Sequence, residues 1–275
     1  IAAHMFRHPL FYGFEKPLTE LRAETRQQEV SPAPQLPNTA ITLGSNATAV
    51  APSRSRDGST LLMINSHQPL TGPVSWYEVH LQSGEGLNVM GGLFIGSPAL
   101  GVGFNQHHGW GATVNQPDLV DVYVLEMDPE DNNRYRVDGE WLGLEAFDIP
   151  IKVLLWGWLP WTVTEKGYRS IHGPVMKTDH GTYALRYAGM DEIRQVEQWL
   201  AMSAATSFDE WREAMALQHI ASFNFVYANA DGDIHFVHNA MMPRRVVGWQ
   251  WDQYLPGDRR ELIWDGYLTP DELPS

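Results

Sequence analysis

Apolar and polar residues alternate along most of the chain with the two-residue period that is typical of β-strands. After residue 44, short apolar stretches are separated by turn signals, and residues 45–52 and 60–66 read as the two strands of a hairpin. Asp-Gly pairs favour tight hairpin turns, and four of them stand beside apolar stretches: Asp57-Gly58, Asp138-Gly139, Asp231-Gly232 and Asp265-Gly266. The pattern predicts antiparallel sheet.

Two helices are expected in the second half of the chain. In residues 191–204 the apolar side chains recur at helical spacing, at Ile193, Val196, Trp199 and Leu200. A second helix is expected over residues 207–218, because it opens with Ser207-Phe208-Asp209-Glu210, a capping-box signature. Strands, then helices, then strands again indicate an α+β fold.

Residues 1–44 differ from the rest and are treated as a leader and linker. Residues 14–28 predict a short helix, and the proline-rich residues 31–37 predict an extended linker, since proline lacks a backbone N–H. Residues 45–275 form the main part of the chain.

Composition narrows the classes of function. With 43% hydrophobic and 19% charged residues the chain is globular, and its net charge of -14 argues against a nucleic-acid or anionic-membrane partner. It has no cysteine, which excludes a thiolate nucleophile and disulfides. No apolar run approaches the ~20 residues of a membrane span. The 11 tryptophans fit either an aromatic core or a pocket for an apolar acyl group.

Ser45 is the first candidate for chemistry. It follows Gly44 at the end of the leader, where a cut would give Ser45 a free α-amine. Such an amine titrates near ~7.7–8.0, so one residue would supply both nucleophile and base. The alternative is that Gly44-Ser45-Asn46 is only a turn before a strand.

Two further groups are candidates near Ser45. Ser45 and His67 are each eleven residues from Arg56, so in a hairpin that turns there they would face each other, with His67 orienting the serine or merely ending its strand. The glycine-rich residues 101–115 allow close approach of backbone to a ligand, and the backbone N–H of Val114 could face a developing oxyanion.

Asn224 and Arg245 are candidates from the last part of the chain. An asparagine at the start of a buried strand must be paired or presented to substrate, where its N–H would suit an oxyanion. Arg245 would act electrostatically at the same site or lie on the surface. Zinc is set aside, because the histidine pairs His107/His108 and His235/His238 each fall on opposite faces of a strand.

Asp118 and Asp121 suggest a cation site. Two carboxylates around a backbone carbonyl suit calcium, which prefers several oxygen ligands, and a solvated loop is the equal alternative.

Taken together, these segments resemble the penicillin acylase family of N-terminal nucleophile hydrolases. The likeness runs from Ser45 to the end of the chain and is carried by residues 44–46, 65–69, 76–81, 109–115, 118–121 and 224–245, in matching order. It implies an αββα fold of stacked antiparallel sheets flanked by helices, of which this chain covers only a part.

The resemblance also implies a function. A precursor would cut itself between Gly44 and Ser45 and give a heterodimer with a smaller chain, and Ser45 would attack a linear amide and form an acyl-enzyme. No catalytic cofactor is implied. By resemblance, the backbone N–H of Val114 and the side chain of Asn224 would form the oxyanion hole, and Arg245 would lie near the nucleophile. The resemblance also implies a structural calcium ion, held in part by Asp118, the carbonyl of Val120 and Asp121.

His67 narrows the branch of the family. Penicillin G acylases carry glutamine there, whereas a histidine is similar to the cephalosporin, aculeacin and acyl-homoserine-lactone acylases. This favours fatty-acyl or similar amides as substrates, and the resemblance implies a periplasmic or secreted bacterial enzyme.

Two alternatives stay open. An uncut or truncated relative would have an amide nitrogen at Ser45, could not use it as a base, and would only bind apolar ligands. A serine hydrolase with a Ser-His-Asp triad is disfavoured, because no Gly-x-Ser-x-Gly elbow occurs.

Overall fold

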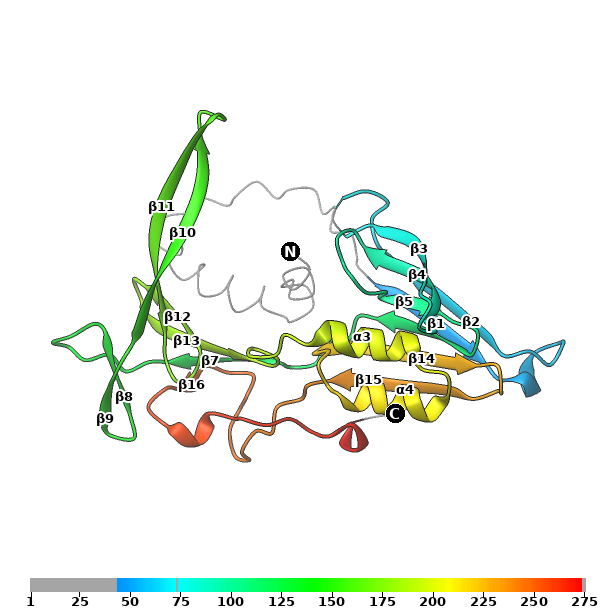
Figure 1. Cartoon of the computed structure of the whole chain (residues 1–275). Coiled ribbons are helices and arrows are strands. Elements are labelled where there is room, and N and C mark those ends of the chain that lie inside the picture. Colours follow the sequence, from blue (N-terminus) through cyan, green and yellow to red (C-terminus); the bar gives the residue numbers. More distant parts are fainter. Residues whose placement is uncertain (1–43, 73, 274–275) are drawn as a thin grey trace, which may run out of the picture.

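Two six-stranded sheets organise the residues that the computed structural model describes, 44–72 and 74–273 (Figure 1). The first sheet has the order β15-β14-β6-β5-β4-β3 and is antiparallel throughout. Its strands are β3 (Trp76–Gln82), β4 (Asn88–Phe94), β5 (Val102–Phe104), β6 (His108–Thr113), β14 (Ser222–Asn229) and β15 (Ile234–Ala240).

The second sheet has the order β10-β11-β12-β13-β7-β16, and only its β16–β7 pair is parallel. Its strands are β7 (Val120–Val124), β10 (Glu145–Leu155), β11 (Leu159–Arg169), β12 (Pro174–Thr178), β13 (Gly181–Tyr187) and β16 (Leu255–Pro256). Two separate hairpins pair β1 (Ser45–Val50) with β2 (Leu61–Ser66) and β8 (Arg134–Val137) with β9 (Glu140–Gly143).

Helices cover one face of the first sheet, and the β1–β2 hairpin lies on the other. Helices α3 (Gln195–Ala204) and α4 (Phe208–Ala216) place Trp199 and Trp211 against Phe225, and all three side chains are buried. Burying an aromatic side chain of this size contributes roughly 1.5–3 kcal/mol. On the opposite face, a Cβ on Gly111 would come within 2.7 Å of Ile64 Cγ1, so glycine lets the hairpin approach the sheet.

The expected α+β fold of stacked antiparallel sheets is confirmed. The described residues form three layers around the first sheet, namely helices, sheet and the β1–β2 pair, which fits part of an αββα arrangement. The helix and linker expected within residues 14–37 lie outside the described residues. Three short 3-10 turns complete the described elements, at Pro52–Arg54, Arg260–Leu262 and Pro270–Glu272.

Both helices form where their local signals place them, but the first begins later than expected and the second ends at Ala216, two residues early. Ser207 Oγ accepts a hydrogen bond from the Glu210 N–H at 3.2 Å, as the capping box predicts. The Glu210 carboxylate instead accepts from the N–H of Thr206 at 2.7 Å, one residue before the cap. The first helix begins at Gln195, four residues later than expected, where its N-cap Arg194 makes no side-chain capping bond.

The Asp-Gly pairs serve different turns. Asp138-Gly139 joins β8 to β9 as a two-residue turn with φ of 49° and 87°, and Asp231-Gly232 lies in the β14–β15 connection. Asp57-Gly58 belongs to the longer β1–β2 connection. Asp265-Gly266 does not join two strands, so that expectation was wrong; it precedes Tyr267, which forms an isolated bridge with Pro243.

The β10–β11 hairpin projects from the second sheet (Figure 1). Phe147, Ile149 and Ile151 lie on one of its faces and are each more than 40% exposed. Trp156, at φ 51° in the turn, and Trp158 are 81% and 72% exposed. The hairpin therefore presents apolar surface that the described residues leave uncovered.

Within the described ranges, the structure contains no helix that is both long enough and apolar enough to span a bilayer.

Candidate active site

Ser45 begins β1 and points toward the first sheet. Ser45 and Ala47 are half-buried whereas Asn46 between them is exposed, so the odd-numbered residues face inward. A Cβ on Gly109 would meet Leu62, and one on Gly111 would meet Ile64. Leu62 thus lies over Gly109 and Ile64 over Gly111, so the same spacing places Ser66 over Thr113, at the end of β6. Ser45 pairs with Ser66 and therefore lies at the same end of the sheet.

His67 does not face Ser45 across the hairpin, and this expectation was wrong by one residue. Ser45 pairs with Ser66, and the N–H of His67 donates to the carbonyl of Gly44 at 3.0 Å. The reason is that the connection holds ten residues, 51–60, an even number that has no single residue at its centre. A shift of one residue moves a side chain to the other face. The His67 ring accordingly lies 3.1 Å from Asn46 Nδ2 on the exposed side, and any catalytic role for His67 stays a prediction.

The Ser45 hydroxyl donates a hydrogen bond of 2.6 Å to the carbonyl oxygen of Gly44. That carbonyl belongs to the peptide bond at which the sequence predicts a cut. The bond therefore places the candidate nucleophile beside the group that a self-cleavage reaction would have to attack.

Ser45 opens onto a small cavity with mostly apolar walls. Val114 and Ser66 also line this cavity, and its aromatic wall includes Trp76 and Phe94, whose rings stack with centroids 4.4 Å apart. Phe223 and Trp199 extend the wall toward the helices. The cavity measures about 30 Å³, which leaves room for little more than one water-sized group, and its apolar lining with a few polar groups is the composition that is typical of ligand pockets.

Asn224 belongs to a row of polar side chains across three strands of the first sheet. On β14, Asn224 is paired with Thr113 of β6 and with His238 of β15. Its Nδ2 donates to Thr113 Oγ1 at 3.2 Å, and its Oδ1 lies 2.8 Å from His238 Nδ1. Phe223 and Phe225 next to it pack with Trp199, so this row faces the β1–β2 side.

The structure brings together some of the sequence-predicted site residues. Ser45 and Val114 share one cavity, and Asn224 bonds to the residue just before Val114. Asn224, His67 and Arg245 are not among the residues that line that cavity. Sequence reasoning missed Thr113 and His238, whose only signal would have been the pairing register of β14 with its neighbours.

Arg245 is held by the two carboxylates that were expected to bind calcium. Its Nε donates to Asp121 Oδ2 at 3.1 Å and its Nη1 to Asp118 Oδ2 at 2.8 Å, while its guanidinium lies 5.3 Å from the Trp251 ring. The Asp121 side chain is fully buried. Burial raises the pKa of the Asp121 carboxyl, and the nearby Arg245 charge opposes that rise. Asp121 and Arg245 therefore form a largely buried ion pair, and removing one partner would leave the charge of the other uncompensated.

Removing the Arg245 charge is expected to destabilise the fold. Arg245→Leu leaves the buried Asp121 without its cation, and breaking such a pair costs roughly 3–5 kcal/mol. The matched control is Arg244→Leu, since Arg244 bonds to Glu272 with both side chains exposed, and a pair of that kind contributes only about 0–1 kcal/mol. Urea unfolding at neutral pH measures both changes. Equal losses for the two variants would contradict the buried-pair assignment.

The calcium site that the resemblance implies at Asp118, Val120 and Asp121 stays a prediction, and these residues alone supply too few ligands for it. Calcium takes about six to eight oxygen ligands, whereas Val120 adds one carbonyl and no cluster of three His, Cys, Asp or Glu occurs in the described part of the chain. Asp121 Oδ1 is buried and has no hydrogen-bond partner there. With Arg245 balancing the charge, EGTA should leave the melting temperature unchanged, and a drop would establish a bound cation.

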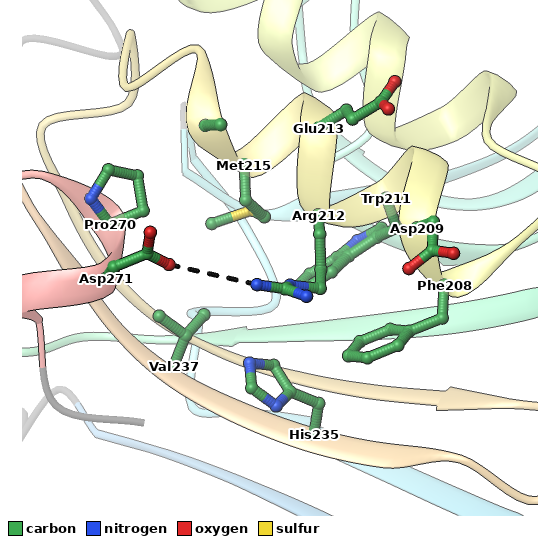
Figure 2. A pocket seen from close by; sticks show the side chains of 11 residues that line it. Phe208, Asp209, Trp211, Arg212, Glu213, Met215, His235, Val237, Pro270 and Asp271 are labelled. Atoms are coloured by element: carbon green, nitrogen blue, oxygen red, sulfur yellow. Dashed lines mark ion pairs between the residues drawn. The ribbon is translucent and has the colours of Figure 1, made fainter.

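A larger hollow lies elsewhere, between α4, β15 and the Pro270–Glu272 turn (Figure 2). It measures about 700 Å³, and Arg212 reaches across it to Asp271 at 3.9 Å, with His235 and Phe208 nearby. Both partners of this ion pair are exposed. Its lining residues include no side-chain hydroxyl and no side-chain amide.

Within each of the two histidine pairs, the side chains point to opposite sides of the sheet, as expected. His108 is buried with its Nε2 3.1 Å from the carbonyl of Met202, and burial lowers its pKa to about 4, whereas His107 is exposed. His235 packs against Phe208 while His238 contacts Asn224 on the other face.

Comparison with known proteins identifies the family. The family model described as penicillin amidase matches residues 4–275. Acyl-homoserine lactone acylase PvdQ of Pseudomonas fluorescens strain Pf0-1 is 31% identical over 212 residues, which cover 74% of this chain and 27% of that protein. Penicillin G acylase of Escherichia coli is 25% identical over 244 residues, covering 82% of this chain and 28% of that protein.

A solved structure agrees with these relatives. The thermostable penicillin G acylase from Alcaligenes faecalis superposes with a TM-score of 0.71 at 27% identity, over 82% of this chain and 40% of that one. The chain spans between 27% and 32% of the length of the curated relatives named here and of PvdQ from Pseudomonas syringae pv. tomato. Because the penicillin amidase family model matches residues 4–275, nearly the whole chain, the chain belongs to the penicillin amidase family.

Proposed function

We propose that the protein containing this chain is an acylase that hydrolyses a linear amide through Ser45 after cutting itself between Gly44 and Ser45. The observation that carries the proposal is the position of Ser45: its hydroxyl contacts the carbonyl of Gly44 and opens onto a cavity that Val114 also lines.

The cut would follow from the contact between Ser45 and Gly44. Ser45 Oγ attacks the Gly44 carbonyl carbon, an ester forms, the C–N bond breaks, and the Ser45 nitrogen takes up the proton. Water then hydrolyses the ester, which leaves a carboxylate on Gly44 and a free hydroxyl and amine on Ser45. The amine is the group that makes Ser45 its own base.

Turnover would repeat this chemistry on a substrate. Ser45 Oγ attacks the amide carbonyl while the α-amine takes its proton, and the leaving amine receives that proton as the acyl-enzyme forms. The backbone N–H of Val114 and the Nδ2 of Asn224 would stabilise the oxyanion, because both groups lie at the end of the sheet where Ser45 sits. Water then releases the acid.

The walls of the cavity favour an apolar acyl group as the part that is recognised. Trp76 and Phe94 provide a stacked aromatic surface beside Ser45, and neither presents a charge. This supports a fatty-acyl or similar amide as substrate, in agreement with the acyl-homoserine lactone acylases among the relatives.

A smaller chain from the same precursor is the proposed partner. The exposed apolar face of β10–β11, with Ile149 and Ile151, supports a covering segment, because a soluble protein rarely leaves so much apolar surface open. The named relatives are bacterial, and a periplasmic or secreted location remains part of this proposal.

Mass spectrometry of the full gene product tests the cut. We expect two chains that elute together, with the larger one beginning at Ser45. The Ser45→Ala protein should appear as one uncut chain, since it lacks the attacking hydroxyl. A single wild-type chain that binds apolar ligands without turnover would instead support the non-catalytic alternative.

A further inference from the structure

The amide of Asn224 has two orientations, and the structure holds one of them. Its Oδ1 faces His238 Nδ1 at 2.8 Å, and its Nδ2 faces Thr113 Oγ1 at 3.2 Å. The side-chain NH2 has two hydrogens, and Thr113 accepts one of them. The second hydrogen remains for an oxyanion. Turning the amide over would put a carbonyl oxygen in that place, and two oxygens that both carry negative charge repel each other.

Of the two neighbours, only His238 can select this orientation. The Thr113 hydroxyl both donates and accepts, so it can pair with either end of the amide. A neutral imidazole with its proton on Nδ1 can only donate from that atom, and it therefore requires Oδ1 to face it. His238 and Asn224 are directly opposite each other on β15 and β14, which fixes the approach of the two groups.

We propose that His238 is a positioning residue, which donates from Nδ1 to Asn224 Oδ1 and thereby keeps the Asn224 N–H turned toward the oxyanion formed at Ser45. The inference rests on the proposed function of Ser45 and Asn224. It assigns to a half-buried histidine, outside the cavity at Ser45, a specific part in stabilising the transition state.

A purely structural role is the competing explanation. A cross-strand polar pair contributes roughly 0.2–1 kcal/mol to a sheet, and its loss would lower the melting temperature without changing the chemical step. The two explanations differ in kcat, because an oxyanion donor acts in the transition state and contributes little to ground-state binding.

Three variants of His238, made in the processed full-length protein, provide the test. Asparagine can donate from its amide nitrogen to Asn224 Oδ1 but does not exclude the reversed pairing, aspartate has the same shape but can only accept, and leucine does neither. We expect His238→Asn to keep kcat within about threefold. We expect His238→Asp and His238→Leu to lower kcat by about 10- to 100-fold, a fraction of the ~10²–10³ for losing an oxyanion donor. KM should change little in all three.

The leucine variant separates orientation from charge, because a carboxylate near the oxyanion would also oppose it. A matched control is His80→Leu, since His80 Nε2 lies 2.7 Å from Asn88 Oδ1 and makes the same kind of pair at the opposite edge of the sheet. This variant should leave kcat unchanged. Melting temperatures measured alongside confirm that each variant is folded.

The outcomes distinguish this inference from the function on which it rests. If Asn224→Ala loses activity while His238→Leu and His238→Asp keep it, the positioning role is wrong and the acylase proposal stands. Equal losses for His238→Asn and His238→Leu would also overturn it, since a donor at Nδ1 would then be irrelevant. Activity that survives Ser45→Ala would remove the proposed function itself.

Discussion

Replacing Ser45 with alanine is expected to abolish both self-cleavage and turnover. The hydroxyl that contacts the Gly44 carbonyl is the only attacking group in the proposed cut, and the uncut chain has no α-amine to act as base. Loss of a nucleophile from such a unit lowers kcat by about 10⁴-fold or more. The measurement is hydrolysis of a fatty-acyl amide, with the cut followed by mass.

Ser66 provides the matched control for this substitution. It lies directly opposite Ser45 on β2 and lines the same cavity, but it has a residue on either side and gains no free amine from the cut. Ser66→Ala should retain kcat within about threefold, since it removes a hydroxyl of the same kind without removing the nucleophile. If Ser66→Ala were as inactive as Ser45→Ala, the assignment of the nucleophile would have to be revised.

Local sequence signals predicted both helices and several of the hairpins, because the causes of these elements are local. Ser207 caps α4, and Asp138-Gly139 turns β8 into β9, since each needs only neighbouring residues. The register of β1 on β2 was missed by one residue because the ten-residue connection, not its Asp-Gly pair, sets where the strands meet. Local pattern cannot reveal how a loop of that length closes.

The site combines residues that are distant in the chain, and this part was only partly predictable. Asn224 was singled out from its strand, but its partners Thr113 and His238 come from two other strands. Arg245 was expected near the nucleophile, and that expectation did not include the bond that the structure shows to Asp121, 124 residues earlier in the sequence. Such contacts depend on strand order, and a single sequence without its pairing does not contain that order.

Asn224→Ala is expected to lower kcat by roughly 10²- to 10³-fold with little change in KM. The reason is that the amide N–H would meet charge only as the oxyanion develops, so its loss affects the transition state more than the bound substrate. Steady-state kinetics on the amide substrate separate the two constants. The control is Asn88→Ala, because Asn88 is also an asparagine paired with a histidine, but on β4 near the far edge of the sheet.

Stability must be measured with the same variant, because Asn224 also satisfies its neighbours. Its removal leaves the Thr113 hydroxyl and the His238 ring without this partner, at a cost of about 1–3 kcal/mol. Kinetics are therefore taken well below the melting temperature of Asn224→Ala. If kcat then stays within about threefold of the wild type, Asn224 is a structural link between β6 and β15, and the oxyanion must be held by backbone groups such as the Val114 N–H instead.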